Sequence, residues 1–261
     1  MSFSTIGLEA EDGIAVLTLN RPRVRNAIDG TMRAELREAI EEIAADTTIR
    51  GVVLTGAGSA FCSGGDIRGM QERLEQGARA GELGWRRQRE FHHTLAKLFH
   101  LDRPTVAAVN GPAFGLGLDV ALTCDFVFAA ESAVLAASFV RRGLVPDGGG
   151  LFHLPRRVGL VRAKELVFSG RAVEAKEAVH IGLADRVLPD GELRAGAVAF
   201  LREFAEQPAL AQGLAKDILN RSLELGYDEV NTLGSQAQAI CYASPDHQES
   251  VRAFLAARDR K

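Results

Sequence analysis

Apolar and polar positions divide the first half of the chain into alternating strands and helices. Short apolar runs with the length and composition of buried strands occupy residues 14–19, 51–55, 105–109 and 126–129. Between the first two runs, residues 31–44 place their apolar side chains at helical spacing. A strand, a helix and a second strand in this order indicate a crossover unit, so we predict an α/β fold with a parallel sheet.

The segment 71–90 breaks this alternation. It is highly charged and contains Gly77, Gly81 and Gly84, which interrupt any helical pattern. We therefore expect a solvated loop here, or alternatively a mobile lid, with a helix only over 94–101.

The last part of the chain has a helical pattern only. Helices are predicted at 208–225, 229–242 and 245–258, and no low-complexity linker precedes them. The change of character near residue 200 predicts a core over residues 1–200. Residues 201–261 then form a C-terminal helical subdomain of the same functional unit.

Composition excludes several classes of partner. The 261 residues are 46% hydrophobic and 25% charged, which is ordinary for a globular protein. The formal net charge of -3 provides no basic surface for nucleic acid or anionic membranes. No apolar stretch reaches the roughly 20 residues that cross a bilayer.

Cysteine usage and the N-terminal sequence favour a cytoplasmic location. The three cysteines, Cys62, Cys124 and Cys241, are far apart and form no CxxC pair, which favours a reducing compartment. The first residues show no basic region followed by an apolar run, so we expect no signal peptide.

Two glycine-rich turns are the strongest candidates for chemistry. Ser63-Gly64-Gly65 and Gly115-Leu116-Gly117 each precede a predicted helix, where free backbone N–H groups can hold a phosphate or a developing oxyanion. Nucleotide-binding glycine motifs, a GxSxG elbow and an HExxH metal motif are all missing. The sequence therefore predicts no metal site.

Three aspartates lie near these glycines, and each also has an ordinary structural interpretation. Asp119 lies in the first turn of a helix, where an acid complements the helix dipole. Asp147 lies in a Pro-Asp-Gly turn, and Asp66 occupies a helix start as a capping residue. Spacing alone does not separate these interpretations from a catalytic one.

A series of motifs follows in order along most of the chain. They are LNRP at 19–22, VLTG at 53–56, AFCSGGDI at 60–67, PTVAAVNG at 104–111 and GLVPD at 143–147. Together they resemble the crotonase superfamily, the enoyl-CoA hydratase/isomerase family. The resemblance implies an α/β ββα spiral core with a C-terminal helical oligomerisation subdomain, assembled as a homotrimer or a dimer of trimers.

The resemblance also implies a substrate and an oxyanion hole. The substrate is an acyl-CoA thioester, which brings coenzyme A with it, and no cofactor is permanently bound. The backbone N–H groups of Gly65 and Leu116 match the two family donors that hold the thioester oxygen as it becomes an enolate. Most members have glycine where this chain has Leu116, so we expect its side chain to lie close to the thioester.

The acids of the resembling proteins separate two reactions. Family hydratases use two glutamates, which fall on Asp119 and Phe139 here, and a phenylalanine cannot transfer protons. Some family isomerases instead place their acid at the position of Asp147. We therefore predict double-bond isomerisation, with Asp147 moving the proton and Asp119 acting as a second acid or positioning a water. Hydration by Asp119 and Asp147 is one alternative, and an acyl-CoA-binding member without catalysis is another.

Further contacts to substrate and CoA are expected from the resemblance. They are Arg23, Arg25, Ala27, Ser63, Asp66, Ile67, Phe139, Phe254 and Arg258. The two N-terminal arginines have an alternative interpretation as solvated surface residues, and Phe254 as an ordinary packed side chain. Residues 71–100 and 133–142 are expected to line the acyl pocket.

Overall fold

The computed structural model describes residues 3–258, apart from the side chain of Arg73. Its larger sheet has the strand order β1-β2-β3-β4-β6-β9, and only the β1–β2 pair is antiparallel. The strands are β1 (Ile6–Glu11), β2 (Ile14–Leu19), β3 (Gly51–Gly56), β4 (Thr105–Val109), β6 (Phe126–Ala130) and β9 (Arg186–Leu188). A smaller sheet in the order β5-β7-β8 contains β5 (Ala113–Phe114), β7 (Val134–Ala136) and β8 (Val173–Glu174).

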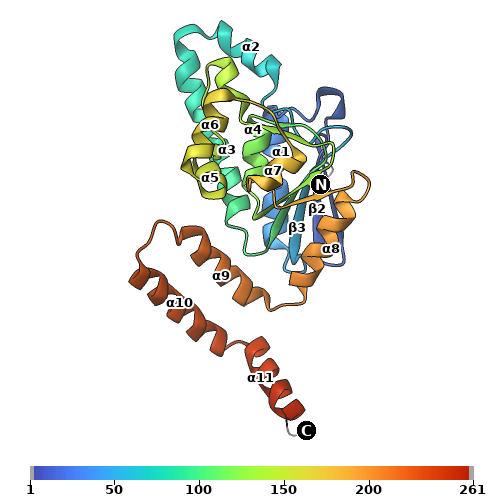
Figure 1. Cartoon of the computed structure of the whole chain (residues 1–261), viewed down its shortest axis with the longest axis vertical. Helices are drawn as coiled ribbons and strands as arrows, with labels where there is room; N and C mark the ends of the chain where they lie inside the picture. The colour runs from blue at the N-terminus through green and yellow to red at the C-terminus, as the bar shows by residue number, and fades with distance from the viewer. Residues whose placement is uncertain (1–2, 259–261) are drawn as a thin grey trace.

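Helices connect and cover these strands (Figure 1). They are α1 (Gly30–Ala45), α2 (Ile67–Glu75), α3 (Ala80–Phe99), α4 (Leu116–Leu122), α5 (Gly150–Val158), α6 (Leu160–Ser169), α7 (Ala175–His180), α8 (Leu193–Ala205), α9 (Ala209–Arg221), α10 (Tyr227–Tyr242) and α11 (Pro245–Arg258). Short 3-10 turns occur at Pro22–Val24, Gly77–Arg79 and Ser138–Arg142. Over residues 3–258, no helix combines the length and the hydropathy needed to cross a membrane.

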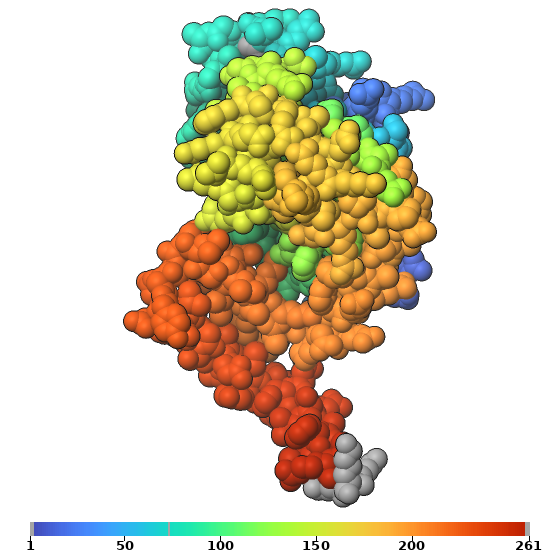
Figure 2. All heavy atoms as spheres, in the orientation of Figure 1, coloured from blue at the N-terminus to red at the C-terminus, as the bar shows by residue number. Residues whose placement is uncertain are grey.

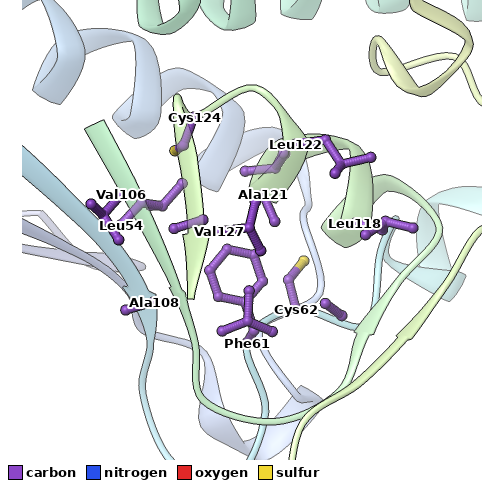
Figure 3. Packing of buried hydrophobic residues seen from close by; sticks show 14 of the residues in the cluster. Leu54, Phe61, Cys62, Val106, Ala108, Leu118, Ala121, Leu122, Cys124 and Val127 are labelled. Atoms are coloured by element: carbon purple, nitrogen blue, oxygen red, sulfur yellow. The ribbon is translucent and has the colours of Figure 1, made fainter. Parts of the chain in front are cut away.

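The predicted strands are confirmed because their apolar runs are buried from end to end. All of β4 is buried, and its neighbours β3 and β6 are nearly so. Parallel strands that are covered on both faces read as continuous apolar runs rather than as alternating ones. Figure 3 shows Leu54, Phe61 and Val127 within this core, together with residues of α4. The core thereby fixes the start of α4, where one glycine-rich turn lies.

The prediction of a loop over 71–90 is wrong, because this segment belongs to α2, the 3-10 turn at Gly77–Arg79 and α3. The last turns of α3 bury Phe91, Leu95 and Leu98, and the helix packs against α1. Each glycine in an exposed helix position destabilises it by about 1 kcal/mol relative to alanine. Tertiary packing of the apolar face outweighs that penalty, because most helical stability in proteins comes from such packing.

The helices predicted for the last part of the chain are confirmed, and α9, α10 and α11 extend away from the body of the molecule (Figures 1 and 2). Lys216 of α9 fastens this extension to the core by donating to Asp125 at 2.7 Å and to the Arg103 carbonyl at 2.9 Å. The predicted division between residues 200 and 201 falls inside α8, which packs on the sheet. The division into two units itself stays a prediction.

Candidate active site

The two glycine-rich turns lie side by side in the structure. The Phe114 amide donates to the Cys62 carbonyl at 2.9 Å, and a Cβ on Gly117 would lie 2.2 Å from the same oxygen. A Cβ on Gly64 would lie 3.5 Å from the Leu116 nitrogen. Backbones approach this closely only because glycine has no side chain. The fold thus brings the predicted donors from both turns into one place.

The amides of Gly65 and Leu116 are available to a ligand. Within residues 3–258, neither donates a hydrogen bond to a protein acceptor. Leu116 is the first residue of α4, so its N–H has no partner in the preceding turn of helix. Gly115, with φ of 53°, makes the reversal that turns this N–H outward from the helix start. Two such amides suit an oxygen that gains negative charge.

The side chain of Leu116 packs against the loop that carries Asp147. It is 4% exposed, and a Cβ on Gly148 would lie 2.5 Å from its Cδ1 atom. The extra side chain at this position therefore fills the space between α4 and Gly148, in contact with the loop backbone. In this way the Leu116 side chain connects the second glycine-rich turn to the loop that carries Asp147.

Asp147 is half-buried and surrounded by donors and cations. Gln88 donates from Nε2 to its Oδ2 atom, and the His92 ring hydrogen-bonds to its carbonyl oxygen. Burial raises the pKa of Asp147 above its usual range, while the charges of Arg33, His92 and Arg87 oppose the rise. The carboxylate is therefore more basic than an exposed aspartate and yet has partners for its charge.

Asp119 is completely buried beneath the same loop. Its Oδ2 atom accepts a hydrogen bond from Gly148 at 2.8 Å, and its Oδ1 atom lies beside Gly150 without a hydrogen bond of normal geometry. The pKa of Asp119 is raised to about 7, mainly by burial; the charge of Asp147 contributes to the rise, and the Gly148 hydrogen bond opposes it. The carboxyl group thus supports the backbone next to Asp147.

Phe139 stands beside the second glycine-rich turn. Its ring edge would lie 3.8 Å from a Cβ on Gly115, and the residue is 8% exposed. The position that the resemblance matches to the second hydratase glutamate therefore presents an apolar ring to the second glycine-rich turn.

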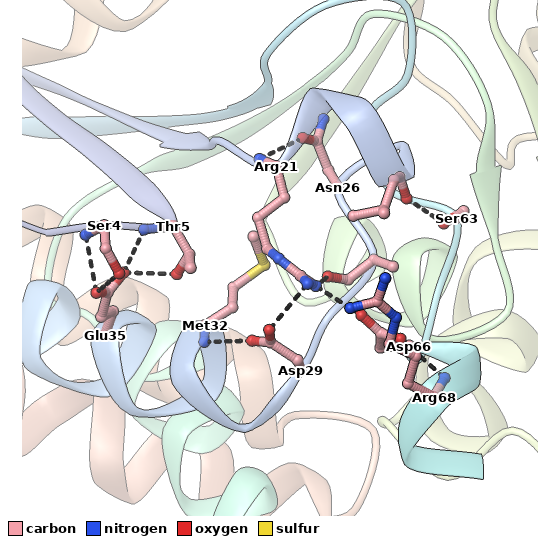
Figure 4. A network of polar contacts seen from close by, with 12 residues as sticks. Ser4, Thr5, Arg21, Asn26, Asp29, Met32, Glu35, Ser63, Asp66 and Arg68 are labelled. Carbon is pink, nitrogen blue, oxygen red and sulfur yellow. Dashed lines mark hydrogen bonds and ion pairs between the residues drawn. The ribbon is translucent and has the colours of Figure 1, made fainter. Parts of the chain in front are cut away.

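Arg21 organises the entrance to the first glycine-rich turn (Figure 4). It pairs with Asp66 at 2.9 Å and Asp29 at 3.0 Å, and it donates to the Ala27 carbonyl. Although burial opposes the shift, hydrogen bonds from Arg68 and Arg21 lower the pKa of Asp66. Asp66 and Ala27 thus have structural partners within the chain, and Asp66 accepts from the Arg68 amide as predicted for a helix start.

Ser63, Arg23 and Arg25 lie close together near this turn. The Ser63 hydroxyl donates to the Val24 carbonyl at 3.3 Å, and the Ser63 amide donates to the Arg25 carbonyl at 2.9 Å. Both arginines are exposed, and a surface pocket is lined by residues 20–24. Their roles toward coenzyme A stay predictions.

The remaining predicted contacts are far from one another within a single chain. Ile67 begins α2 and is 68% exposed, whereas Phe254 and Arg258 lie exposed on α11. Figure 1 places α2 and α11 at opposite ends of the molecule. The chain on its own therefore does not bring α11 to the glycine-rich turns.

Sequence reasoning missed the residues that face Asp147. Arg33 comes from α1, and Gln88 and His92 come from α3. The spacing of four residues between Gln88 and His92 places them on one helix face, but only a correct prediction of α3 reveals that face. Among the described residues, no three His, Cys, Asp or Glu side chains could hold a metal ion.

Comparison with known proteins decides the family. The sequence profile of the enoyl-CoA hydratase/isomerase family matches residues 9–261. The chain belongs to this family. As a member it is an enzyme of the lyase and isomerase type, and the resemblance to the crotonase superfamily is confirmed.

Curated relatives of this hydratase/isomerase family member include both kinds of enzyme. The 1,2-epoxyphenylacetyl-CoA isomerase of Escherichia coli is 37% identical over 95% of this chain and 94% of its own length. A probable enoyl-CoA hydratase of Rhodobacter capsulatus is 36% identical over 99% of this chain and 97% of its own. Overall identity therefore does not separate the two reactions.

A solved structure supports the fold of the family member. The enoyl-CoA hydratase/isomerase of Cupriavidus metallidurans superimposes with a TM-score of 0.91 at 32% identity, covering 98% of this chain and 95% of that one. The predicted crotonase-like α/β fold with a helical C-terminal region is confirmed.

Proposed function

We propose that this enzyme moves the double bond of an unsaturated acyl-CoA through an enolate. The observation that carries the proposal is the placement of Asp147, a half-buried and oriented carboxylate on a loop that touches Leu116 through Gly148. Phe139 occupies the position of the second hydratase acid. One accessible base beside two free amides suits isomerisation better than the addition of water.

In the proposed reaction, Asp147 takes a proton from C2 of a 3-enoyl thioester. The electron pair of the broken C–H bond delocalises onto the thioester oxygen, which the amides of Gly65 and Leu116 hold. Loss of one such donor typically costs about 3–4 kcal/mol of transition-state stabilisation. Asp147 then returns the proton to C4, and the double bond forms between C2 and C3. No proton is gained or lost overall.

We assign a different part to Asp119. With no exposed surface and one oxygen bonded to Gly148, it supports the loop of Asp147 in the structure as it stands. To act as a second acid it would need the loop to open. Support of the loop is the role that the burial favours.

We also propose the form of the substrate, its coenzyme A contacts, the assembly and the location of the enzyme. The substrate enters as a coenzyme A ester, with no permanently bound cofactor, and Arg23 and Arg25 approach its phosphates. A trimer or dimer of trimers would bring Phe254 and Arg258 to a neighbouring subunit. Free cysteines at positions 62, 124 and 241 favour a reducing, cytoplasmic location.

Hydration is the second candidate, favoured by the two neighbouring carboxyl groups and by relatives that are named hydratases. Incubation with crotonyl-CoA and with a 3-enoyl-CoA separates the reactions. We expect the 3-enoyl ester to gain conjugated absorbance and crotonyl-CoA to keep it. Loss of the crotonyl absorbance would establish hydration, and tight binding without turnover of either ester would indicate a non-catalytic member.

The residue assignment is tested by Asp147→Asn. Because general acid–base catalysis contributes about 10²–10⁴-fold, we expect isomerisation to fall at least a hundredfold with nearly unchanged binding of the ester. Asp119→Asn keeps an oxygen that can accept from Gly148 and should retain most activity. Asp217→Asn, on an exposed part of α9, is the control for charge removal. Full activity of Asp147→Asn would end the assignment.

A further inference from the structure

The Gln88 side chain lies between the guanidinium of Arg33 and the carboxylate of Asp147. Arg33 of α1 donates from Nη1 to its Oε1 atom at 3.1 Å. On the other side, Gln88 donates from Nε2 to the Oδ2 atom of Asp147. The side chain of one helix thus connects a second helix to the loop of the active site.

The two partners determine how the Gln88 amide is oriented. A guanidinium can only donate hydrogen bonds, and an ionised carboxylate can only accept them. The amide oxygen must therefore face Arg33, and the amide nitrogen must face Asp147. A reversed amide would place a donor against a donor and an acceptor against an acceptor, so this orientation is fixed by chemistry.

We propose that Gln88 is a positioning residue that holds Oδ2 of Asp147, so that Oδ1 is the oxygen which takes and returns the substrate proton. The inference rests on the proposed role of Asp147 in isomerisation. A proton on Oδ2 would compete with the N–H of Gln88 for the same oxygen. Gln88 thereby selects one of two otherwise equivalent oxygens and fixes the plane of the carboxylate.

Several other groups around Asp147 influence its charge. Arg33 faces it from α1, Arg87 and His92 from α3, and the Asp119 carboxyl from α4. His92 binds the backbone carbonyl of Asp147 and so holds the loop rather than the carboxylate. Gln88 hydrogen-bonds a carboxylate oxygen of Asp147 directly through its side chain, and the backbone N–H of Asp147 is a further donor to the carboxylate.

Gln88→Met tests the proposal, because methionine keeps the length and helix preference of glutamine but has no N–H. A hydrogen bond to a charged group is worth about one pKa unit or more, so the pKa of Asp147 should rise by about one unit. The rise is read from a ¹³C carboxyl titration by NMR, with Asp147→Asn identifying the signal. The acid limb of the pH profile should move upward equally, and kcat should fall roughly ten- to hundredfold with little change in KM.

Two further variants separate donation from packing. Gln88→Glu keeps the shape and the acceptor for Arg33 but removes the donor, so it should fail to restore kcat and should raise the pKa of Asp147 further. Glu90→Gln, exposed on the same helix, should match the wild type.

An unchanged pKa of Asp147 in Gln88→Met, or wild-type kcat in Gln88→Glu, would overturn the proposal. The failure of the proposed function gives a different result. If the wild-type enzyme does not isomerise 3-enoyl-CoA, the kinetic experiments have no activity to compare, and the assignment of the proton-transferring oxygen is wrong. The NMR arm still reports separately whether Gln88 donates to Asp147.

Discussion

Asp119 and Asp147 are two aspartates on either side of one backbone segment, and their surroundings differ. Both have a raised pKa because both are withdrawn from water. Asp119 is completely buried and accepts a hydrogen bond from the Gly148 amide, whereas Asp147 is half-buried and faces Arg33 of α1 and Arg87 and His92 of α3. The contrast shows that a carboxyl group buried beside another acid has its pKa raised to about 7, whereas cationic neighbours oppose the rise at the partly buried carboxyl group.

The largest expected effect on stability concerns Asp119. Its pKa rises from 3.8 to about 7 on folding, so its contribution is present at low pH and is lost as pH rises to about 7. Three pKa units correspond to about 4 kcal/mol. We expect Asp119→Asn to remove this loss. Urea unfolding between about pH 4 and pH 8, at constant protein concentration, measures it because the loss develops between the unfolded and folded pKa values.

Asp147→Asn is the comparison for that experiment. Its raised pKa acts in the same direction, but the side chain is less buried and has cations beside it. The change of unfolding free energy with pH should therefore flatten less than in Asp119→Asn. Equal flattening in both variants would contradict the distinction between the two acids.

Gly150→Ala breaks the contact between Asp119 and the loop. The new Cβ would lie 2.2 Å from the Asp119 Oδ1 atom and 2.9 Å from the Pro146 Cβ atom. Overpacking of this kind destabilises by about 1–3 kcal/mol and should displace Asp147. The midpoint temperature of thermal unfolding and the turnover rate with a 3-enoyl-CoA should both decrease. Gly30→Ala is the control for adding a methyl group, because a Cβ on Gly30 has no atom within 4 Å.

Gly84→Ala has the smallest expected effect, with the opposite sign. Gly84 lies in α3, and a Cβ there meets nothing within 4 Å. The substitution should stabilise the protein by up to about 1 kcal/mol and leave turnover unchanged. A destabilised variant in urea unfolding would show that this part of α3 is not a regular helix in solution.

Sequence reasoning predicted the core well because its strands are continuous apolar runs. Residues 14–19 and 105–109 coincide with β2 and β4, since burial on both faces leaves no ambiguity of period. The two-residue strands of the small sheet were missed, because two residues carry no period. The prediction for α3 is wrong because glycine lowers helix stability through local sequence, which can be read from the chain. The stabilising burial of Phe91 and Leu98 depends on tertiary packing, which cannot.

The candidate site was also predicted only in part from the sequence. Motifs located the two turns and both aspartates, because glycine and acidic residues at turns have a recognisable local chemistry. Gln88 and His92 carry no such signal, and their importance comes only from where α3 passes Asp147. The role of Leu116 was likewise visible only in three dimensions, where its side chain rests on Gly148.

The close contact between Gly117 and the Cys62 carbonyl has a consequence for how such an enzyme can diverge. A Cβ on Gly117 would lie 2.2 Å from the Cys62 carbonyl oxygen, so a larger residue in one turn requires the backbone of the other turn to move. Substitutions in the two turns are therefore coupled. In helix α3, a Cβ on Gly81 or Gly84 would have no atom within 4 Å. Because residues 71–100 are predicted to line the acyl pocket, a search for altered acyl preference should diversify α3 first and leave the two glycine-rich turns unchanged.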